Sequence, residues 1–198
     1  MSYYSEGNIA GSVELGAINE MLSSIGEPPV STLDGEANVD VANARRILFT
    51  VNREVQAQGW TFNIEQNVEL IPDTFTKLIP YDLDVLNMRS STTSTPYVNI
   101  GGFVYDRLTK QDRFEGPIYA DIIRMRGLDE MPECFKRLIV VRASLRFATR
   151  FFGDPSIVQA LQMEEREAYR QCNEYEHDYG NYNALQGDTY IQQLLSRG

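Results

Sequence analysis

The hydrophobic pattern of this 198-residue sequence changes its period twice, and this change constrains the fold more than any other feature. From residue 13 to about residue 59, apolar residues recur every three or four positions, which is typical of amphipathic helices. From residue 60 to about 126, apolar and polar residues alternate, as in "WTFNIEQNVELI" and "YVNIGGFVYDRL", which is typical of strands with one buried face. The helical period returns from residue 129 to about 179. The sequence therefore predicts an α+β fold with a small antiparallel β-rich domain inserted between helices.

Four helices are expected, and capping residues set their limits. Ser12 can cap a first helix over 13–25 that ends at Gly26, and a second helix runs from 38–40 to Gly59. Asp129 or Glu130 can cap a third helix that ends near Phe152, with Pro132 in its first turn. Asp154 caps a fourth, which continues to about Tyr179. We expect a four-helix bundle-like domain (1–59 and 127–180), the inserted β-rich domain (60–126) and a C-terminal docking tail (181–198).

Two loops stand out in this pattern. Pro28 and Pro29 follow the first helix closely and block its continuation, because proline lacks the N–H group and disfavours helix at the preceding residue. Residues 27–36 then form a stiff, polar segment. Residues 89–96, "RSSTTSTP", contain no core residue and are expected to form a polar loop within the β-rich part.

Composition restricts the classes of function. The apolar fraction of 42% and the charged fraction of 23% are typical of globular proteins. The formal net charge of −10 argues against a protein that clamps nucleic acid. It suits a soluble protein, or the surface of a channel that DNA passes without binding to it. Neither a secretion signal nor a membrane-spanning run is visible. Cys134 and Cys172 match no metal spacing, and we expect both to be reduced core residues.

Catalytic motifs are missing from the sequence. His177 is the single histidine and has no nucleophile elbow to pair with, and we expect no cofactor or metal. Two carboxylate pairs have the spacing that a retaining glycosidase could use, because residues three apart share a helix face. They are Glu130 with Glu133 and Glu164 with Glu167. Acid-rich helices meet this spacing by chance, so glycoside hydrolysis is the weaker alternative and the expected catalytic set is empty.

A basic stripe on the third helix is the clearest candidate for an interface. Arg142, Arg146 and Arg150 recur every four residues, whereas the following segment is acidic. The two faces can pair within the chain, or they can meet between neighbouring copies of an oligomer. Glu165 lies in the apolar seam of the fourth helix, where a polar residue sets the register or pairs with arginine. Tyr179, Tyr182 and the Pro28–Pro29 loop are further interface candidates.

Several long strings of the sequence resemble one family, the tail tubular protein A of short-tailed phages. The string "ELGAINEMLSSIGEPPVSTLDGEANVDVANARRIL" is similar to its N-terminal part. "QGWTFN", "VYDR", "DEMPECF", "RFFGDP" and "CNEYEHDYGNYNAL" resemble its later landmarks in the same order. The resemblance covers nearly the whole chain and is weakest at residues 1–11 and 89–96.

The resemblance implies a structural virion protein with a helical and a β-rich part. Members of the family form a ring of identical copies, twelve by resemblance, that serves as adaptor and gatekeeper between the portal and the tubular nozzle. The implied partners are the portal protein, the nozzle protein (tail tubular protein B) and double-stranded DNA in transit, with no membrane. The implied location is the virion tail, after synthesis in the bacterial host cytoplasm. The family motifs carry no catalytic residue.

Overall fold

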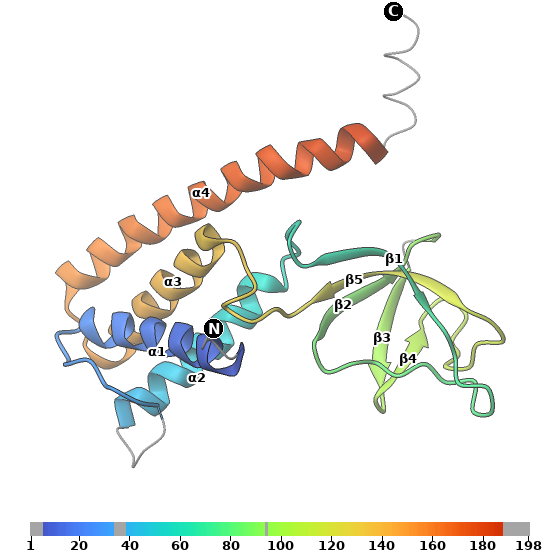
Figure 1. The fold of residues 1–198 in the computed structure, drawn as a ribbon, viewed down its shortest axis with the longest axis horizontal. Helices are drawn as coiled ribbons and strands as arrows, with labels where there is room; N and C mark the ends of the chain where they lie inside the picture. Colours follow the sequence, from blue (N-terminus) through green and yellow to red (C-terminus); the bar gives the residue numbers. More distant parts are fainter. Residues whose placement is uncertain (1–5, 34–38, 94, 188–198) are drawn as a thin grey trace, which may run out of the picture. The chain divides into compact units, whose positions relative to one another are not determined.

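The computed structural model describes residues 6–33, 39–93 and 95–187, and the chain divides into two compact units (Figure 1). The helical unit comprises the chain up to Asn52 and from Gly127 onward, and the sheet unit comprises Arg53–Arg126. The described residues form four helices and one five-stranded antiparallel sheet. The predicted α+β fold is thereby confirmed. The four-helix bundle arrangement, the domain borders and the docking tail stay predictions.

The first two helices are α1, Glu6–Ser23, and α2, Val39–Gln56. Helix α1 begins before Ser12, so the predicted cap at that residue is wrong and Ser12 lies inside the helix. The helix ends as expected. Gly26 has a φ of 81°, and the Glu27 N–H donates to the Leu22 carbonyl at 3.0 Å, which closes the helix with a left-handed glycine.

The other two helices are α3, Glu133–Phe151, and α4, Pro155–Gly187. Asp129 and Glu130 do not cap α3. Pro132 occupies the N-cap position, without a capping side chain. The helix does not begin earlier in the chain because proline disfavours helix at the residue before it. The cap of α4 is confirmed, since the Asp154 carboxylate accepts from Ser156 N–H at 2.8 Å. Helix α4 also continues past the predicted end at residue 179.

Helix α3 is the centre of the helical unit and packs against both α1 and α4. Its buried side chains lie on most of its circumference (Phe135, Leu138, Ile139, Val140, Val141, Ala143, Ser144, Phe147 and Ala148). Cys134 and Cys172 are free thiols within hydrogen-bonding distance of each other. Burial raises the pKa of the Cys172 thiol to about 12, so this thiol stays protonated.

The sheet has the strand order β1-β5-β2-β3-β4. Its strands are β1 (Ile64–Leu70), β2 (Val85–Ser90), β3 (Pro96–Ile100), β4 (Phe103–Asp106) and β5 (Ile118–Arg124). A hairpin with Gly101 and Gly102 at its turn joins β3 to β4, and both glycines have positive φ.

Strand β2 was not predicted, and its last two residues fall in the segment expected to be a loop. The irregularity between Val85 and Asn87 explains this difference. It places the buried Val85 and Met88 three positions apart, which removes the alternation that identifies a strand. The loop itself is confined to the residues between Ser90 and Pro96.

The antiparallel topology gives the sheet two distinct ends. At the connection end the chain enters at Ile64 and leaves at Arg124, and this end also holds the β3–β4 turn. At the loop end lie residues 71–78, which begin the connection from β1 to β2, the turn that follows Ser90, and the connection 107–117 from β4 to β5. Buried residues from the strands and from the connections between them form the core of the sheet unit (Ile79, Val85, Met88, Tyr97, Val104, Phe114, Ala120 and Ile122).

Candidate interface surfaces

The Pro28–Pro29 loop is exposed but anchored. Both prolines lie at the surface. The side-chain amide of Asn19 in α1 donates to the Val30 carbonyl at 3.0 Å and accepts from the Val30 N–H at 2.8 Å. The glycine closure of α1 fixes one side of the loop and Asn19 fixes the other. The loop is therefore preorganised, at least over residues 27–33, whereas residues 34–36 of the predicted segment lie outside the described residues.

We expect Asn19→Ala to loosen this loop. The substitution leaves the Val30 N–H and carbonyl without their partner, which should cost about 1–2 kcal/mol of unfolding free energy because the site is partly buried. Hydrogen exchange at the Val30 amide should become faster. Ser31→Ala, at an exposed position of the same loop, is the matched control and should leave that amide protected; equal exchange rates in both variants would contradict the anchoring role.

The arginine stripe is only partly available at the surface. Arg142 donates from Nε and Nη2 to Glu165 Oε1 at 2.8 and 2.5 Å, and both side chains are less than a quarter exposed. Its guanidinium also lies over the Tyr169 ring. Arg146 is half-buried and has an interaction within the chain, whereas Arg150 is exposed. The predicted pairing of Glu165 with an arginine is confirmed, and Arg150 is the exposed member of the stripe.

An aromatic stack begins at the contact between α3 and α4 and continues along α4. Phe135 meets Tyr175 edge to face with ring centroids 5.5 Å apart, and Tyr175 stacks on Tyr179 at 4.3 Å. Phe135 is close to the start of α3, so α4 extends past α3 from this point (Figure 1). Tyr179 is 57% exposed. Tyr182 follows in α4, although its side chain lies outside the described part.

Three of the four candidate acids are held by separate partners. Glu130 accepts from the Gly127 N–H at 3.0 Å, and Glu133 pairs with Lys136 at 2.8 Å. Arg170 and Gln171 lower the pKa of Glu167 to about 2, whereas a general acid in glycoside hydrolysis needs a raised pKa.

Glu164 is exposed and faces Glu20 of α1. Partial burial, together with the charge of Glu164, raises the pKa of Glu20. Neither of the two described cavities is lined by Glu20 or by any of the four acids. This geometry gives no support to sugar hydrolysis.

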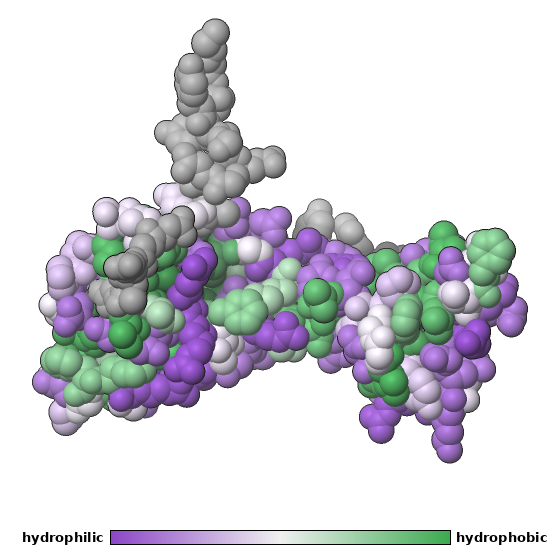
Figure 2. Space-filling model, turned by 90° about the horizontal axis from the view of Figure 1, so that it is seen from below, coloured by the Kyte–Doolittle hydropathy of each residue, from purple (hydrophilic) through white to green (hydrophobic). Residues whose placement is uncertain are grey.

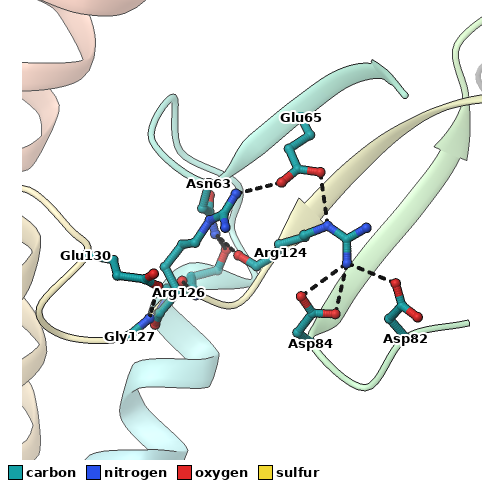
Figure 3. A network of polar contacts seen from close by, with 9 residues as sticks. Asn63, Glu65, Asp82, Asp84, Arg124, Arg126, Gly127 and Glu130 are labelled. Carbon is teal, nitrogen blue, oxygen red and sulfur yellow. Dashed lines mark hydrogen bonds and ion pairs between the residues drawn. The ribbon is translucent and has the colours of Figure 1, made fainter. Parts of the chain in front are cut away.

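Two arginines hold three carboxylates at the connection end of the sheet (Figure 3). Arg124 donates to Glu65 at 3.0 Å, to Asp84 at 2.9 Å and to Asp82 at 3.2 Å. Arg126 donates to the second oxygen of Glu65 at 2.6 Å. Partial burial alone would lower the pKa of Arg124, but the hydrogen bonds to Glu65, Asp84 and Asp82 raise it. The cluster thus ties β1, β5 and the segment before β2 together.

Two fully buried amides join the segments at which the chain enters and leaves the sheet unit. The Asn63 amide donates to the carbonyls of Gln56 and Arg124, each at 3.0 Å, and accepts from the Trp60 N–H at 2.8 Å. The Gln56 amide donates to the Arg126 carbonyl at 2.9 Å and accepts from its N–H at 2.7 Å. Sequence reasoning missed both residues. In the sequence, both stand beside apolar residues, which could have indicated their burial. Gln56 follows Val55, and Asn63 lies between Phe62 and Ile64.

The helical unit contains a cavity of about 290 Å³, hereafter the α1–α2 cavity. Its floor and rim combine apolar and charged side chains (Glu14, Arg45, Leu48, Phe49, Leu128 and Asp129). Arg45 and Glu14 of this lining form an ion pair at 2.8 Å, and Phe49 is 58% exposed. A cavity of this size accommodates a side chain better than a large ligand.

The described residues bring together no metal-binding group of three or more His, Cys, Asp or Glu side chains. His177 is exposed on α4. Within the same residues, every helix falls short of the length and hydrophobicity that crossing a membrane would require.

The comparison with protein families gives one match, and it spans both units. The family model described as tail tubular protein matches residues 15–182. A comparison with curated proteins gives no significant match. The matched range includes α2, α3 and every strand of the sheet, together with the second half of α1 and most of α4. The chain therefore belongs to the tail tubular protein family and has a structural role in a phage tail.

Proposed function

We propose that this protein is the ring-shaped adaptor of a short phage tail, in which identical copies, twelve by resemblance, connect the portal to the nozzle protein. The observation that carries the proposal is the family match over residues 15–182, which covers the whole sheet unit and most of the helical unit. In this role the ring acts as gatekeeper, and DNA crosses its channel during packaging and ejection.

The charge of the chain supports the passage of DNA. A net charge of −10 on each copy repels phosphates, so DNA can slide through a channel lined by such copies without being held. Binding to portal and nozzle then depends on local surfaces rather than on a general affinity for nucleic acid.

The proposed contacts use surfaces that are exposed in the structure. The Pro28–Pro29 loop is preorganised and can dock on the portal or on a neighbouring copy with little ordering cost. Tyr179 is exposed on α4, one turn beyond the contact of Tyr175 with Phe135 of α3. Tyr182 follows it in α4, and its side chain lies outside the described part. Arg150 provides an exposed positive charge, whereas Arg142 and Arg146 act through contacts within the chain.

The assembly is tested by measuring mass in solution. We expect the full chain to form a complex with the mass of a closed ring when purified portal protein is present, and this complex to bind the nozzle protein. Replacement of Pro28 and Pro29 with alanine should weaken the portal complex. A chain that stays monomeric with both partners present would contradict the adaptor role.

Arg150→Glu should weaken ring assembly, and more strongly at low than at high salt. The reason is that Arg150 is exposed, so its interaction with an acidic neighbouring copy is screened by salt. Ring formation measured by sedimentation over a salt series checks this result. Arg46→Glu is the control, because Arg46, on α2, is also exposed. Weakening independent of salt would contradict an electrostatic role.

A further inference from the structure

The loop end of the sheet carries a short, rigid loop, residues 72–78, hereafter the Phe75 loop. The Asp73 carboxylate accepts from Phe75 N–H at 3.1 Å, from Thr76 N–H at 2.8 Å and from the Thr76 hydroxyl at 2.9 Å. Backbone hydrogen bonds of 2.9 Å from Lys77 N–H to Asp73 and from Asp73 N–H to Leu78 close the loop. The hydrogen bonds that Thr76 and Phe75 donate to the Asp73 carboxylate lower its pKa, so this carboxylate is ionised at neutral pH.

The Phe75 loop is also held from outside. Arg113 donates to the Thr76 carbonyl at 3.0 Å, and the Phe114 N–H donates to the Lys77 carbonyl at 2.9 Å. Phe114 itself belongs to the buried core of the sheet unit. The loop is thus built on the core, and its conformation is fixed before any partner arrives.

This rigid loop presents a phenylalanine to solvent. The Phe75 side chain is 92% exposed, and Ile71 and Leu108 at the same end are 69% and 64% exposed. Figure 2 shows such hydrophobic residues at the surface of each unit among hydrophilic ones. An aromatic side chain on a preorganised loop loses little conformational entropy on binding, which is the property of an interface anchor.

Charge indicates what kind of surface the anchor meets. The segments 71–78 and 107–117 hold four basic residues (Lys77, Arg107, Lys110 and Arg113) and three acidic ones (Asp73, Asp112 and Glu115), one more basic than acidic, although the whole chain has a net charge of −10. Lys77 pairs with the exposed Glu115 at 3.7 Å. The partner is therefore expected to be acidic around an apolar hollow. The α1–α2 cavity of this same chain is lined by Leu48 and Phe49 together with Glu14, Arg45 and Asp129. Because Arg45 pairs with Glu14 at 2.8 Å, Asp129 gives this lining its net negative charge.

We propose that Phe75 of one copy inserts into the α1–α2 cavity of the next copy, an inference that rests on the proposed ring. A ring needs two different surfaces on each copy that complement each other, and the loop and the cavity lie on different units of the chain. Phe75 would pack against Phe49, and Lys77 would approach Asp129.

The first test compares two exposed hydrophobic residues of the sheet unit. With portal protein present, Phe75→Ala should raise the protein concentration needed for half-maximal ring assembly at least about tenfold, because anchors carry most of an interface's binding energy. Leu83→Ala is the matched control, since Leu83 is 93% exposed but lies at the connection end. It should assemble like the wild type. Asp73→Ala, which loosens the loop while keeping Phe75, should also weaken assembly.

The second test identifies the cavity as the acceptor. A chain with both Phe75→Cys and Phe49→Cys should give a ladder of crosslinked multimers under oxidising conditions, because each copy then links to two neighbours. Either single variant should give dimers at most, and Leu83→Cys with Phe49→Cys should give no ladder.

The outcomes separate this inference from the proposed function. If wild type and Phe75→Ala assemble equally, or if the paired cysteines give no ladder within assembled rings, the inference is overturned while the adaptor role stands. If the wild type forms no ring with portal protein, the proposed function fails first and the inference fails with it.

Discussion

Phe135→Ala should lower the free energy of unfolding by about 3–5 kcal/mol, because it removes a large buried ring and leaves a cavity. The Phe135 side chain has an exposed fraction of 0%, and it meets Tyr175 edge to face at 5.5 Å. This contact joins the start of α3 to the part of α4 that carries the exposed Tyr179. The loss of helical circular dichroism in urea measures the change.

Phe152→Ala is the control for this prediction. Phe152 follows α3 directly but is 53% exposed, so its truncation should change stability by about 0.5 kcal/mol or less. Similar destabilisation by the two variants would show that the α3–α4 core does not depend on Phe135 as the structure indicates.

Asn63→Ala should destabilise the sheet unit by about 3 kcal/mol, because it removes all three hydrogen bonds of a fully buried amide and leaves their backbone partners unsatisfied. Trp60 is the single tryptophan, and its backbone N–H is one of these partners. Tryptophan fluorescence therefore reports directly on this site during urea unfolding. We expect the fluorescence midpoint to shift to lower urea.

Two further variants refine this test. Asn63→Asp keeps the acceptor for Trp60 but loses both donors, and it places a charge in a fully buried site, so it should also be destabilising. Asn87→Ala removes an exposed amide from β2 and should be close to neutral. A shift of less than about 1 kcal/mol for Asn63→Ala would contradict the role of the buried amides.

Much of the fold could be predicted because local signals agree with tertiary packing. Gly26 and Asp154 delimit helices as expected, since their roles depend on backbone geometry and on one nearby donor group. The start of α3 was placed too early because Asp129 has the residue type of a cap, whereas the conformational effect of Pro132 decides the boundary. Strand β2 was missed because its irregular pairing removes the alternation of buried residues.

The candidate surfaces were less accessible to sequence reasoning. The spacing of Arg142 and Arg150 is that of one helix face, but the structure buries the first against Glu165 and leaves the second exposed. This difference depends on where α4 crosses α3, which no local pattern encodes. The Phe75 loop was missed for a related reason, since a single phenylalanine in an alternating segment is expected to be buried, whereas the Asp73 turn directs it outward.

The central claim is that this protein acts through its surfaces as an adaptor in the phage tail. Electron microscopy of particles assembled without it tests this claim most directly. We predict heads without attached tails that lose their packaged DNA. Particles with normal tails and fully retained genomes would contradict it.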